Sequence, residues 1–155
     1  MTLRRATPED LAAVVALQRA AYAPNRVRLG VEPLPLQADY AGIFQTMEVW
    51  LADAPTAGAE GKPGVAGVLI LEPHPDHMLI WSIATDPGRQ ARGLGHTLLV
   101  AAEGKARAFG LPMMRLYTGT VFKHLVSWYA RNGYVTERVE EWPDRSVTFM
   151  AKPLV

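Results

Sequence analysis

Apolar residues recur with the 3.6-residue period of an α-helix in three segments of the chain. Residues 11–22 form the first segment, after Thr7 and Pro8, which suit the cap and the first turn of a helix. Residues 93–109 form the second, and a glycine and a proline that would end a helix follow it. Residues 122–131 form the third, with apolar side chains at i, i+3, i+4 and i+7. We therefore predict three amphipathic helices at these positions.

Short runs rich in β-branched and other apolar residues predict strands. They lie at residues 3–6, 49–52, 65–71, 78–85, 113–118, 134–140 and 147–151. The run at 65–71 is apolar almost throughout, which is typical of a strand buried on both faces. Glycine and proline predict loops at residues 24–35 and 54–64, and a short helix is expected at 38–45.

The order of the predicted elements is β-α-α-β-β-β-α-β-α-β-β. Consecutive strands in the middle favour antiparallel hairpins, whereas the strand, helix and strand between residues 78 and 118 favour a right-handed parallel crossover. We therefore predict an α/β (α+β) fold with a mixed sheet and helices on its faces. A chain of 155 residues, 49% of them hydrophobic, suits a single domain over residues 1–155.

Composition excludes several classes of function. The 16 Lys and Arg residues nearly balance the 15 Asp and Glu residues, so the charge does not favour nucleic acid or an anionic membrane as a partner. No cysteine is present, which excludes disulfides, a thiolate nucleophile and a zinc site built on sulfur. No apolar run has the length of a membrane helix, and the first ten residues turn acidic, so we expect a cytoplasmic protein.

A glycine-rich segment between a predicted strand and a predicted helix carries the chemistry. Residues 86–96 read Asp-Pro-Gly-Arg-Gln-Ala-Arg-Gly-Leu-Gly-His. Glycine lets the backbone approach a ligand, and free N–H groups at a helix start bind anions. Arg89 and Arg92 add positive charge that suits phosphate. The segment therefore predicts a phosphate or pyrophosphate site.

Two common nucleotide motifs fit this segment poorly. Gly88 and Gly93 have the spacing of a P-loop, but Leu94-Gly95 stand where a lysine and a hydroxyl residue are required. A dinucleotide fingerprint would need a glycine where Leu98 stands, and the following strand ends without an acid for a ribose. A nucleotide-binding protein is therefore the weakest of the alternatives.

The pattern Gln90-x-x-Gly93-x-Gly95 resembles a motif of the GCN5-related N-acetyltransferase (GNAT) superfamily. Pro87 precedes the turn as in that family, and residues 128–134, Trp-Tyr-Ala-Arg-Asn-Gly-Tyr, are similar to its tyrosine signature. The order of elements also agrees with the family over essentially the whole chain. The resemblance implies a mostly antiparallel, splayed central sheet of about seven strands flanked by about four helices.

The resemblance also implies that acetyl-CoA (coenzyme A) is the acyl donor, with no metal. In this family the pantetheine arm runs along the strand before the turn, and the turn's amides hold the pyrophosphate. The implied cofactor-binding residues are Ile83, Ala84, Thr85, Gln90, Ala91, Arg92, Gly93, Leu94, Gly95, His96 and Tyr129. The implied reaction is direct attack of a primary amine on the thioester, which agrees with the absence of cysteine.

Tyr129 is the candidate general acid, because a phenol can supply a proton to a thiolate leaving group. Its place in an apolar stripe also fits a purely structural role. The general base is less evident: Glu72 is the first candidate and His77 the second, and an exposed turn residue is the simpler interpretation of both. His74 and His77 are three residues apart, but they lie in a turn with no third ligand, so no metal site is predicted.

The sequence departs from the family on the helix of Tyr129. Many members have asparagine where Phe122 and Leu125 stand, and Thr118, Lys123 and Arg131 are candidate substitutes. Candidates for the acceptor pocket are Tyr22, Arg26, Arg28, Tyr40, Trp81 and Trp142.

Two functions remain open. The first is an N-acetyltransferase acting on a small-molecule or peptide amine. The second is a non-catalytic module that binds coenzyme A or an acyl-CoA on the same fold. By analogy with the family, a homodimer is also expected, with Trp142 as a candidate contact.

Overall fold

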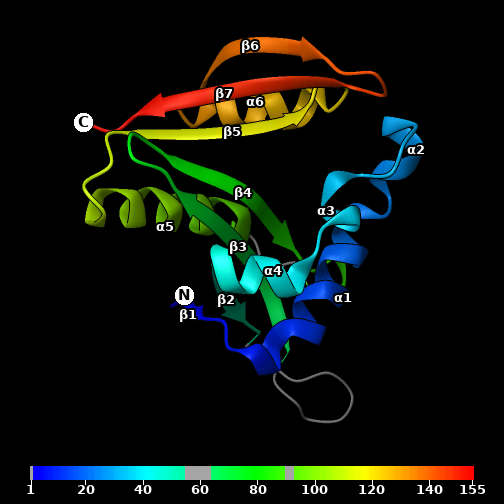
Figure 1. Cartoon of the computed structure of the whole chain (residues 1–155), viewed down its shortest axis with the longest axis vertical. Helices are drawn as coiled ribbons and strands as arrows, with labels where there is room; N and C mark the ends of the chain where they lie inside the picture. Colours follow the sequence, from blue (N-terminus) through cyan, green and yellow to red (C-terminus); the bar gives the residue numbers. More distant parts are fainter. Residues whose placement is uncertain (1, 55–63, 90–92) are drawn as a thin grey trace.

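The computed structural model describes residues 2–54, 64–89 and 93–155 and shows one seven-stranded sheet with helices packed on it (Figure 1). The strand order is β1-β2-β3-β4-β5-β7-β6. Only the β4–β5 pair is parallel among the described pairs, and the other five are antiparallel. The predicted mixed, mostly antiparallel sheet is therefore confirmed.

The helices and strands have the following bounds. The strands are β1 (Arg4–Arg5), β2 (Glu48–Asp53), β3 (Val65–Pro73), β4 (Met78–Thr85), β5 (Met113–Gly119), β6 (Val135–Glu141) and β7 (Ser146–Pro153). The helices are α1 (Leu11–Tyr22), α2 (Asn25–Leu29), α3 (Leu34–Gln37), α4 (Tyr40–Thr46), α5 (Leu94–Ala108) and α6 (Lys123–Arg131). Two 3₁₀ turns, η1 (Pro8–Asp10) and η2 (Pro87–Arg89), precede α1 and α5.

The segment predicted as a loop, residues 24–35, contains α2 and the start of α3, so that prediction is wrong. Pro24 and Pro33 stand at the N-caps of these helices. Proline is tolerated there because the first N–H groups of a helix have no intrahelical partner. Gly30, with φ of 80°, ends α2 in the left-handed conformation that favours glycine. The prolines therefore begin short helices in this segment.

The predicted cap at Thr7 begins the 3₁₀ turn η1, which leads directly into α1. The Thr7 N–H donates to Asp10 Oδ2 over 2.8 Å and forms a capping box with it. The Arg4 guanidinium donates to Asp10 and to Asp53, which joins β1 to η1 and to the end of β2. These hydrogen bonds lower the pKa of Asp10 to about 2, the side-chain hydrogen bond from Arg4 being the largest cause.

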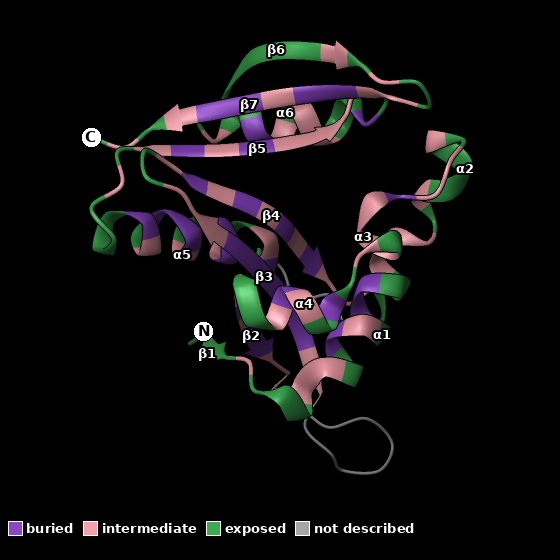
Figure 2. Ribbon diagram, viewed as in Figure 1, coloured by how far each residue is buried: buried purple, intermediate pink, exposed green. Residues whose placement is uncertain are grey.

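The sheet has a hydrophobic core on each face, and β3 contributes to both. Val68 and Ile70 pack on the α1-side core, whereas Leu69 and Leu71 pack on the α5-side core, and all four are fully buried. Figure 2 shows the buried residues along β3 and on the helix faces that meet the sheet. The apolar run of β3 thus follows from helices covering both faces.

The sheet splits between β4 and β5. These strands are paired only at Met78–Ile80 of β4, although both continue beyond that point. Where β3 pairs with β4, Ile70 of β3 lies opposite Ser82 and Leu71 lies opposite Ile80. Trp81 of β4 therefore has no partner and is the extra residue of a β-bulge. The bulge lies where β4 and β5 separate, so the pairing ends at the residue where the strand changes direction.

No helix in the described residues is long and apolar enough to cross a lipid bilayer.

Candidate functional site

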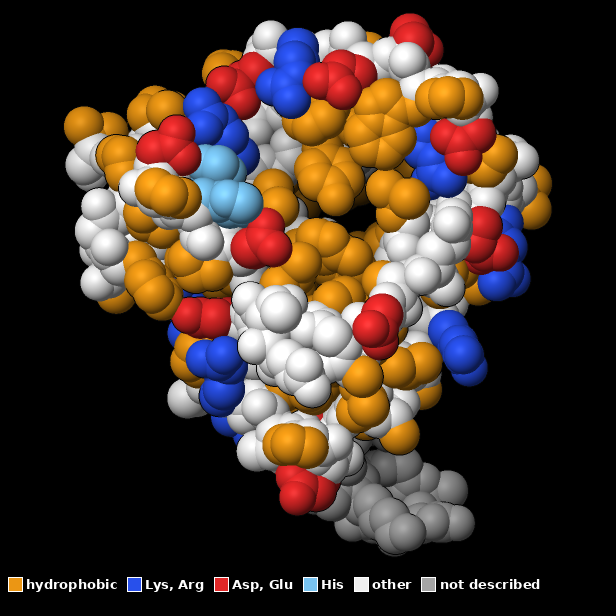
Figure 3. Space-filling model, in the orientation of Figure 1, with side chains coloured by type: hydrophobic (Ala, Val, Ile, Leu, Met, Phe, Trp, Pro, Cys, Tyr) orange, Lys and Arg blue, Asp and Glu red, His pale blue; other side chains and the backbone are white. Residues whose placement is uncertain are grey.

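A cavity of about 510 Å³ lies where β4 and β5 diverge. Its walls come from the open half of β4, the end of β5, helix α6 and the segment from the end of α1 to α3. Figure 3 shows one face of the molecule hollowed, with hydrophobic side chains around the opening. The volume is within the range of small-molecule sites.

The backbone of β4 is open toward the cavity over its second half. The Asp86 N–H donates to the Ala66 carbonyl on β3 over 2.8 Å. Backbone groups alternate in direction along an antiparallel pair, so the N–H and C=O groups of Ile83 and Thr85 point to the opposite side. The Tyr22 hydroxyl lies 3.4 Å from the Ile83 carbonyl, which agrees with that direction. This edge can therefore pair with an extended ligand as a further strand would.

The start of α5 lies beside the end of this edge. Gly93 is its N-cap with φ of 73°, and a Cβ there would meet nothing within 4 Å. The first described bond of the helix runs from the Thr97 N–H to the Gly93 carbonyl, and the first N–H groups of a helix have no partner within it. Gly95 lines the cavity, and a Cβ on it would lie 3.9 Å from Trp128. These features fit an anion such as a phosphate.

Apart from Gly93, the N-cap of α5, the predicted cofactor-binding residues divide into three groups. Ile83, Ala84, Thr85, Gly95 and Tyr129 line the cavity. Leu94 is buried in the α5-side core and His96 is exposed, so their side chains take no part in the cavity wall. Gln90, Ala91 and Arg92 lie outside the described residues.

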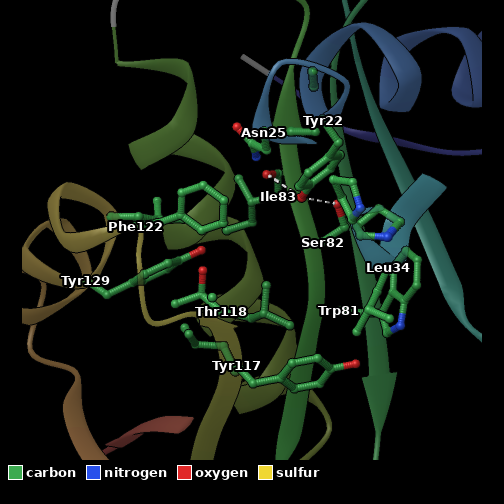
Figure 4. Close-up of a pocket in the computed structure, with 18 of the residues that line it drawn as sticks. Tyr22, Asn25, Leu34, Trp81, Ser82, Ile83, Tyr117, Thr118, Phe122 and Tyr129 are labelled. Carbon is green, nitrogen blue, oxygen red and sulfur yellow. Dashed lines mark hydrogen bonds between the residues drawn. The ribbon is translucent and has the colours of Figure 1, made fainter. Parts of the chain in front are cut away.

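Tyr129 lies on α6 with its ring buried and its hydroxyl directed into the cavity (Figure 4). Its ring contacts Trp128 and Tyr134 edge-on, with centroid distances of 4.9 and 5.6 Å. Burial, and to a lesser degree the Tyr22 phenol, raise the pKa of Tyr129 above its ordinary value. The packing interpretation and the chemical one are therefore compatible, because the ring packs while the hydroxyl reaches the cavity.

The two candidate bases lie at the closed end of the β4–β5 pair. Glu72 accepts a hydrogen bond at 2.6 Å from His74 Nε2, and His77 contacts Asp76 and Arg115. Neither Glu72 nor His77 lines the cavity. The His74 and His77 rings stack with centroids 4.4 Å apart. No group of three or more metal-ligating side chains occurs in the part of the chain that the structure describes.

The predicted acceptor residues are only partly brought together. Tyr22 and Trp81 line the cavity, and Tyr40 packs edge-on behind Trp81 at 6.1 Å. Arg26 is paired with Glu32 at 2.6 Å, and Arg28 lies 3.4 Å from His124.

The Trp142 ring lies tilted beside that of Tyr117, with the centroids 6.5 Å apart, and its Nε1 donates to Glu140 outside the cavity wall. Among the residues proposed in place of the family asparagine, Thr118 lines the cavity beside Phe122 and Leu125, whereas Lys123 and Arg131 do not.

Sequence reasoning missed Ser82 and Arg145. Ser82 is the one hydroxyl among the apolar residues 78–84, and that signal was available in the sequence. Arg145 lines the cavity with its side chain only 5% exposed, and its Nη2 donates to the Glu32 carbonyl over 3.0 Å. It thereby joins the β6–β7 turn to the α2–α3 segment, a contact between residues 113 positions apart that no sequence pattern indicates.

The described residues of the cavity wall carry hydroxyl groups but no carboxylate. The phenols of Tyr22, Tyr117 and Tyr129 and the hydroxyls of Ser82 and Thr118 belong to the lining residues. No described lining residue is Asp or Glu. The wall can therefore donate hydrogen bonds, and a carboxylate base is not part of it.

A family model and solved structures match this chain. The model of the acetyltransferase (GNAT) family matches residues 15–134. No curated protein sequence matches the chain significantly.

Three solved structures illustrate the similarity of fold. A GNAT family acetyltransferase from Elizabethkingia anophelis with acetyl-CoA bound has a TM-score of 0.70 at 16% identity, over 99% of this chain and 97% of that one. The ribosomal-protein-S18-alanine N-acetyltransferase from Escherichia coli has a TM-score of 0.74 at 17% identity, over 98% and 92%. The PaiA N-acetyltransferase from Thermoplasma acidophilum, in complex with coenzyme A, has a TM-score of 0.70 at 17% identity, over 99% and 98%. These matches confirm the fold class.

Proposed function

Because the chain belongs to the acetyltransferase (GNAT) family, we propose that it transfers the acetyl group of acetyl-CoA to a primary amine. We take residues 1–155 to form a single acyltransferase domain. The observation that carries the proposal is the open edge of β4 beside the start of α5. The extended pantetheine arm can pair with the open edge of β4, and the pyrophosphate can bind at the start of α5. Two of the similar structures contain acetyl-CoA or coenzyme A, which supports this donor.

The residues present fit this cofactor. The N–H and C=O groups of Ile83 and Thr85 would bind the amides of the pantetheine arm, since they face the cavity. The N–H groups at the start of α5, next to Gly93, would hold the pyrophosphate together with residues 90–92. When bound, acetyl-CoA supplies a thioester that an amine can attack.

Tyr129 is proposed to hold a proton for the departing sulfur. Its raised pKa keeps the phenol protonated at neutral pH, as a general acid requires. The described cavity wall contains no carboxylate but includes the imidazole of His124, so the amine proton would pass to His124 or to water in the cavity. Glu72 or His77 could act as the base only through such water, because both lie outside the wall.

The acceptor side of the cavity is mainly apolar. Leu29, Leu34 and Trp81 line it, with Arg145 at the β6–β7 turn. This lining suits an amine with an apolar portion, either a small molecule or the end of a peptide. One relative of similar fold acts on an alanine of a ribosomal protein, which makes peptide termini a sensible part of an acceptor screen.

Titration calorimetry with acetyl-CoA, ATP and NADH tests the proposal. We expect saturable binding of acetyl-CoA and no comparable binding of the other two. Equal binding of all three, or no binding of acetyl-CoA, would contradict the assignment.

The absence of a carboxylate from the described cavity wall favours one alternative, a non-catalytic module that binds acyl-CoA. Release of free thiol from acetyl-CoA in the presence of an amine panel separates the two functions. An enzyme releases thiol in proportion to the acetylated amine, whereas a binding module releases none.

A further inference from the structure

A chain of buried polar side chains leads from the start of α3 to the cavity. The Tyr40 hydroxyl lies 2.6 Å from the Pro35 carbonyl, and Gln18 Nε2 lies 3.1 Å from that hydroxyl and 3.0 Å from Ser82 Oγ. Ser82 Oγ lies 2.8 Å from the Tyr22 hydroxyl, which reaches the cavity (Figure 4). Gln18 is fully buried and Ser82 is 3% exposed, so water does not replace these contacts.

The directions of the hydrogen bonds from Tyr40 and Gln18 follow from the number of protons available. A carbonyl oxygen only accepts, so Tyr40 must give its single hydroxyl proton to Pro35. The Gln18 atom near Tyr40 must then be a donor, which fixes it as the amide nitrogen. The same nitrogen donates its second proton to Ser82.

Ser82 then has one proton to donate and two oxygens near it. The Tyr22 hydroxyl lies at 2.8 Å and Gln18 Oε1 at 3.5 Å, and the 2.8 Å hydrogen bond can run in either direction. When Ser82 donates to Tyr22, the proton of Tyr22 is left with a single long contact, 3.4 Å to the Ile83 carbonyl, and is available to a ligand in the cavity. Burial raises the pKa of Tyr22, so the phenol keeps this proton.

We propose that Tyr22 donates a hydrogen bond to the carbonyl oxygen of the acetyl group and is a catalytic residue. This inference rests on the proposed function. Tyr22 lies against Ile83, where the thioester arm is proposed to run, and faces Tyr129 across the cavity. Gln18 and Ser82 are positioning residues that direct the proton of Tyr22 toward the cavity.

The hydrogen bond strengthens as the reaction proceeds. The amine nitrogen bonds to the carbonyl carbon while the carbon–sulfur bond breaks, and negative charge builds on the carbonyl oxygen in between. The amine proton leaves to His124 or to water, and the sulfur receives the proton of Tyr129, which regains one from water. A preorganised donor at the developing charge accelerates such a step.

Paired ligands test this inference without knowledge of the acceptor. S-ethyl-coenzyme A has a methylene in place of the thioester carbonyl. The wild-type protein is expected to bind acetyl-CoA about fivefold to tenfold more tightly than S-ethyl-coenzyme A. In Tyr22→Phe that preference should disappear, whereas the affinity for S-ethyl-coenzyme A should stay unchanged. Tyr117→Phe, which removes another phenol from the cavity wall, is the matched control and should keep the preference.

Gln18→Glu tests the direction of the chain. An ionised carboxylate only accepts, so at a pH high enough to ionise the buried carboxyl group introduced at position 18, Ser82 would donate to it and Tyr22 would donate to Ser82. The preference for the carbonyl should then be lost although Tyr22 is present. Because the preference is a ratio of two affinities of one preparation, a smaller folded fraction does not alter it. A residue that only stabilises the fold would leave this ratio unchanged.

The possible results separate the two proposals. If the wild type binds acetyl-CoA but shows no preference over S-ethyl-coenzyme A, the role of Tyr22 is overturned and the proposed function stands. The same holds if Tyr22→Phe keeps the preference or Tyr117→Phe loses it equally. If the wild type binds neither ligand, the proposed function fails and the inference fails with it.

Discussion

The two halves of β4 are similar in composition, but one is paired on both sides and the other borders the cavity. Met78–Ile80 lie between β3 and β5 and belong to a continuous sheet. Residues 81–85 keep β3 as a neighbour but have lost β5, and the cavity occupies its place. Both halves are mainly apolar, so residue type does not explain the difference.

The difference comes from the bulge at Trp81. Before it, Met78 and Ile80 face the α5-side core, and after it Ala84 faces the α1-side core. Trp81 packs on the α1-side core as well. The closed half therefore serves stability, whereas the open half presents backbone groups to a ligand. Four predictions test this division, and the largest effect comes first.

Gly93→Asp should abolish the ligand-binding function of the open half. We expect acetyl-CoA affinity to fall about 10³-fold, because a carboxylate would repel phosphate where charge-assisted hydrogen bonds are lost. Gly93→Ala has the same strained backbone, φ of 73°, without the charge. Calorimetry should show a clearly smaller loss for alanine. Equal affinities for the two variants would mean that no anion binds at this turn.

Met78→Ala should affect the closed half alone. Met78 is fully buried and lies opposite Met114, which is also fully buried. We expect the free energy of unfolding in urea to fall by about 3 kcal/mol, since a cavity remains in the core. The acetyl-CoA affinity of the folded protein should change less than twofold. A large loss of affinity without a loss of stability would contradict the division of β4.

Tyr129→Phe should reduce turnover without weakening the binding of the donor. We expect kcat to fall about 10²-fold once an acceptor is known, while the affinity for acetyl-CoA stays the same. Because its pKa is raised, Tyr129 should stay protonated through about pH 10, where an ordinary tyrosine titrates. An unchanged kcat in Tyr129→Phe would contradict this role, and a fall in the wild-type kcat near pH 10 that the variant lacks would contradict the raised pKa.

Replacing Asp10, which lies outside β4, should have a small effect on stability. Its pKa is lowered to about 2 by hydrogen bonds from Arg4, so it stabilises the fold above its ordinary pKa. That contribution is lost as the pH falls from about 4 toward 2, and it is below about 1 kcal/mol because solvent screens the pair. Denaturation of Asp10→Asn should show a flatter dependence on pH over this interval. An identical dependence in both proteins would exclude Asp10 as its cause.

Much of the fold could be predicted from periodicity. The long helices follow from the 3.6-residue period and the seven strands from short apolar runs, both of which depend only on local sequence. Helices α2 and α3 were missed because Pro24 and Pro33 were interpreted as breaks, whereas at an N-cap they are compatible with a helix. The bulge at Trp81 depends on pairing with β3, so the sequence of β4 alone does not reveal it.

The candidate site was predictable where it is a local motif. Gly93, Gly95 and the strand before them are neighbours in sequence, and they lie together at one end of the cavity. The contact of Gln18 with Ser82 joins residues 64 positions apart, so only the fold brings it about. Whether Glu72 lies in the cavity wall depends on the residue at which β4 and β5 separate. The apolar pattern of the strands does not predict that residue.

The extra residue at Trp81 also constrains how this protein can diversify. Substitutions along β4, α2 and α3 would change the lining of the cavity while the gap between the strands persists. Deletion of the one residue between Ile80 and Ser82 would instead restore a continuous ladder with β3 and remove the bulge at which β4 leaves β5. Variants with new acceptors should therefore arise by exchange of side chains, and the length of this strand should be the last property to change.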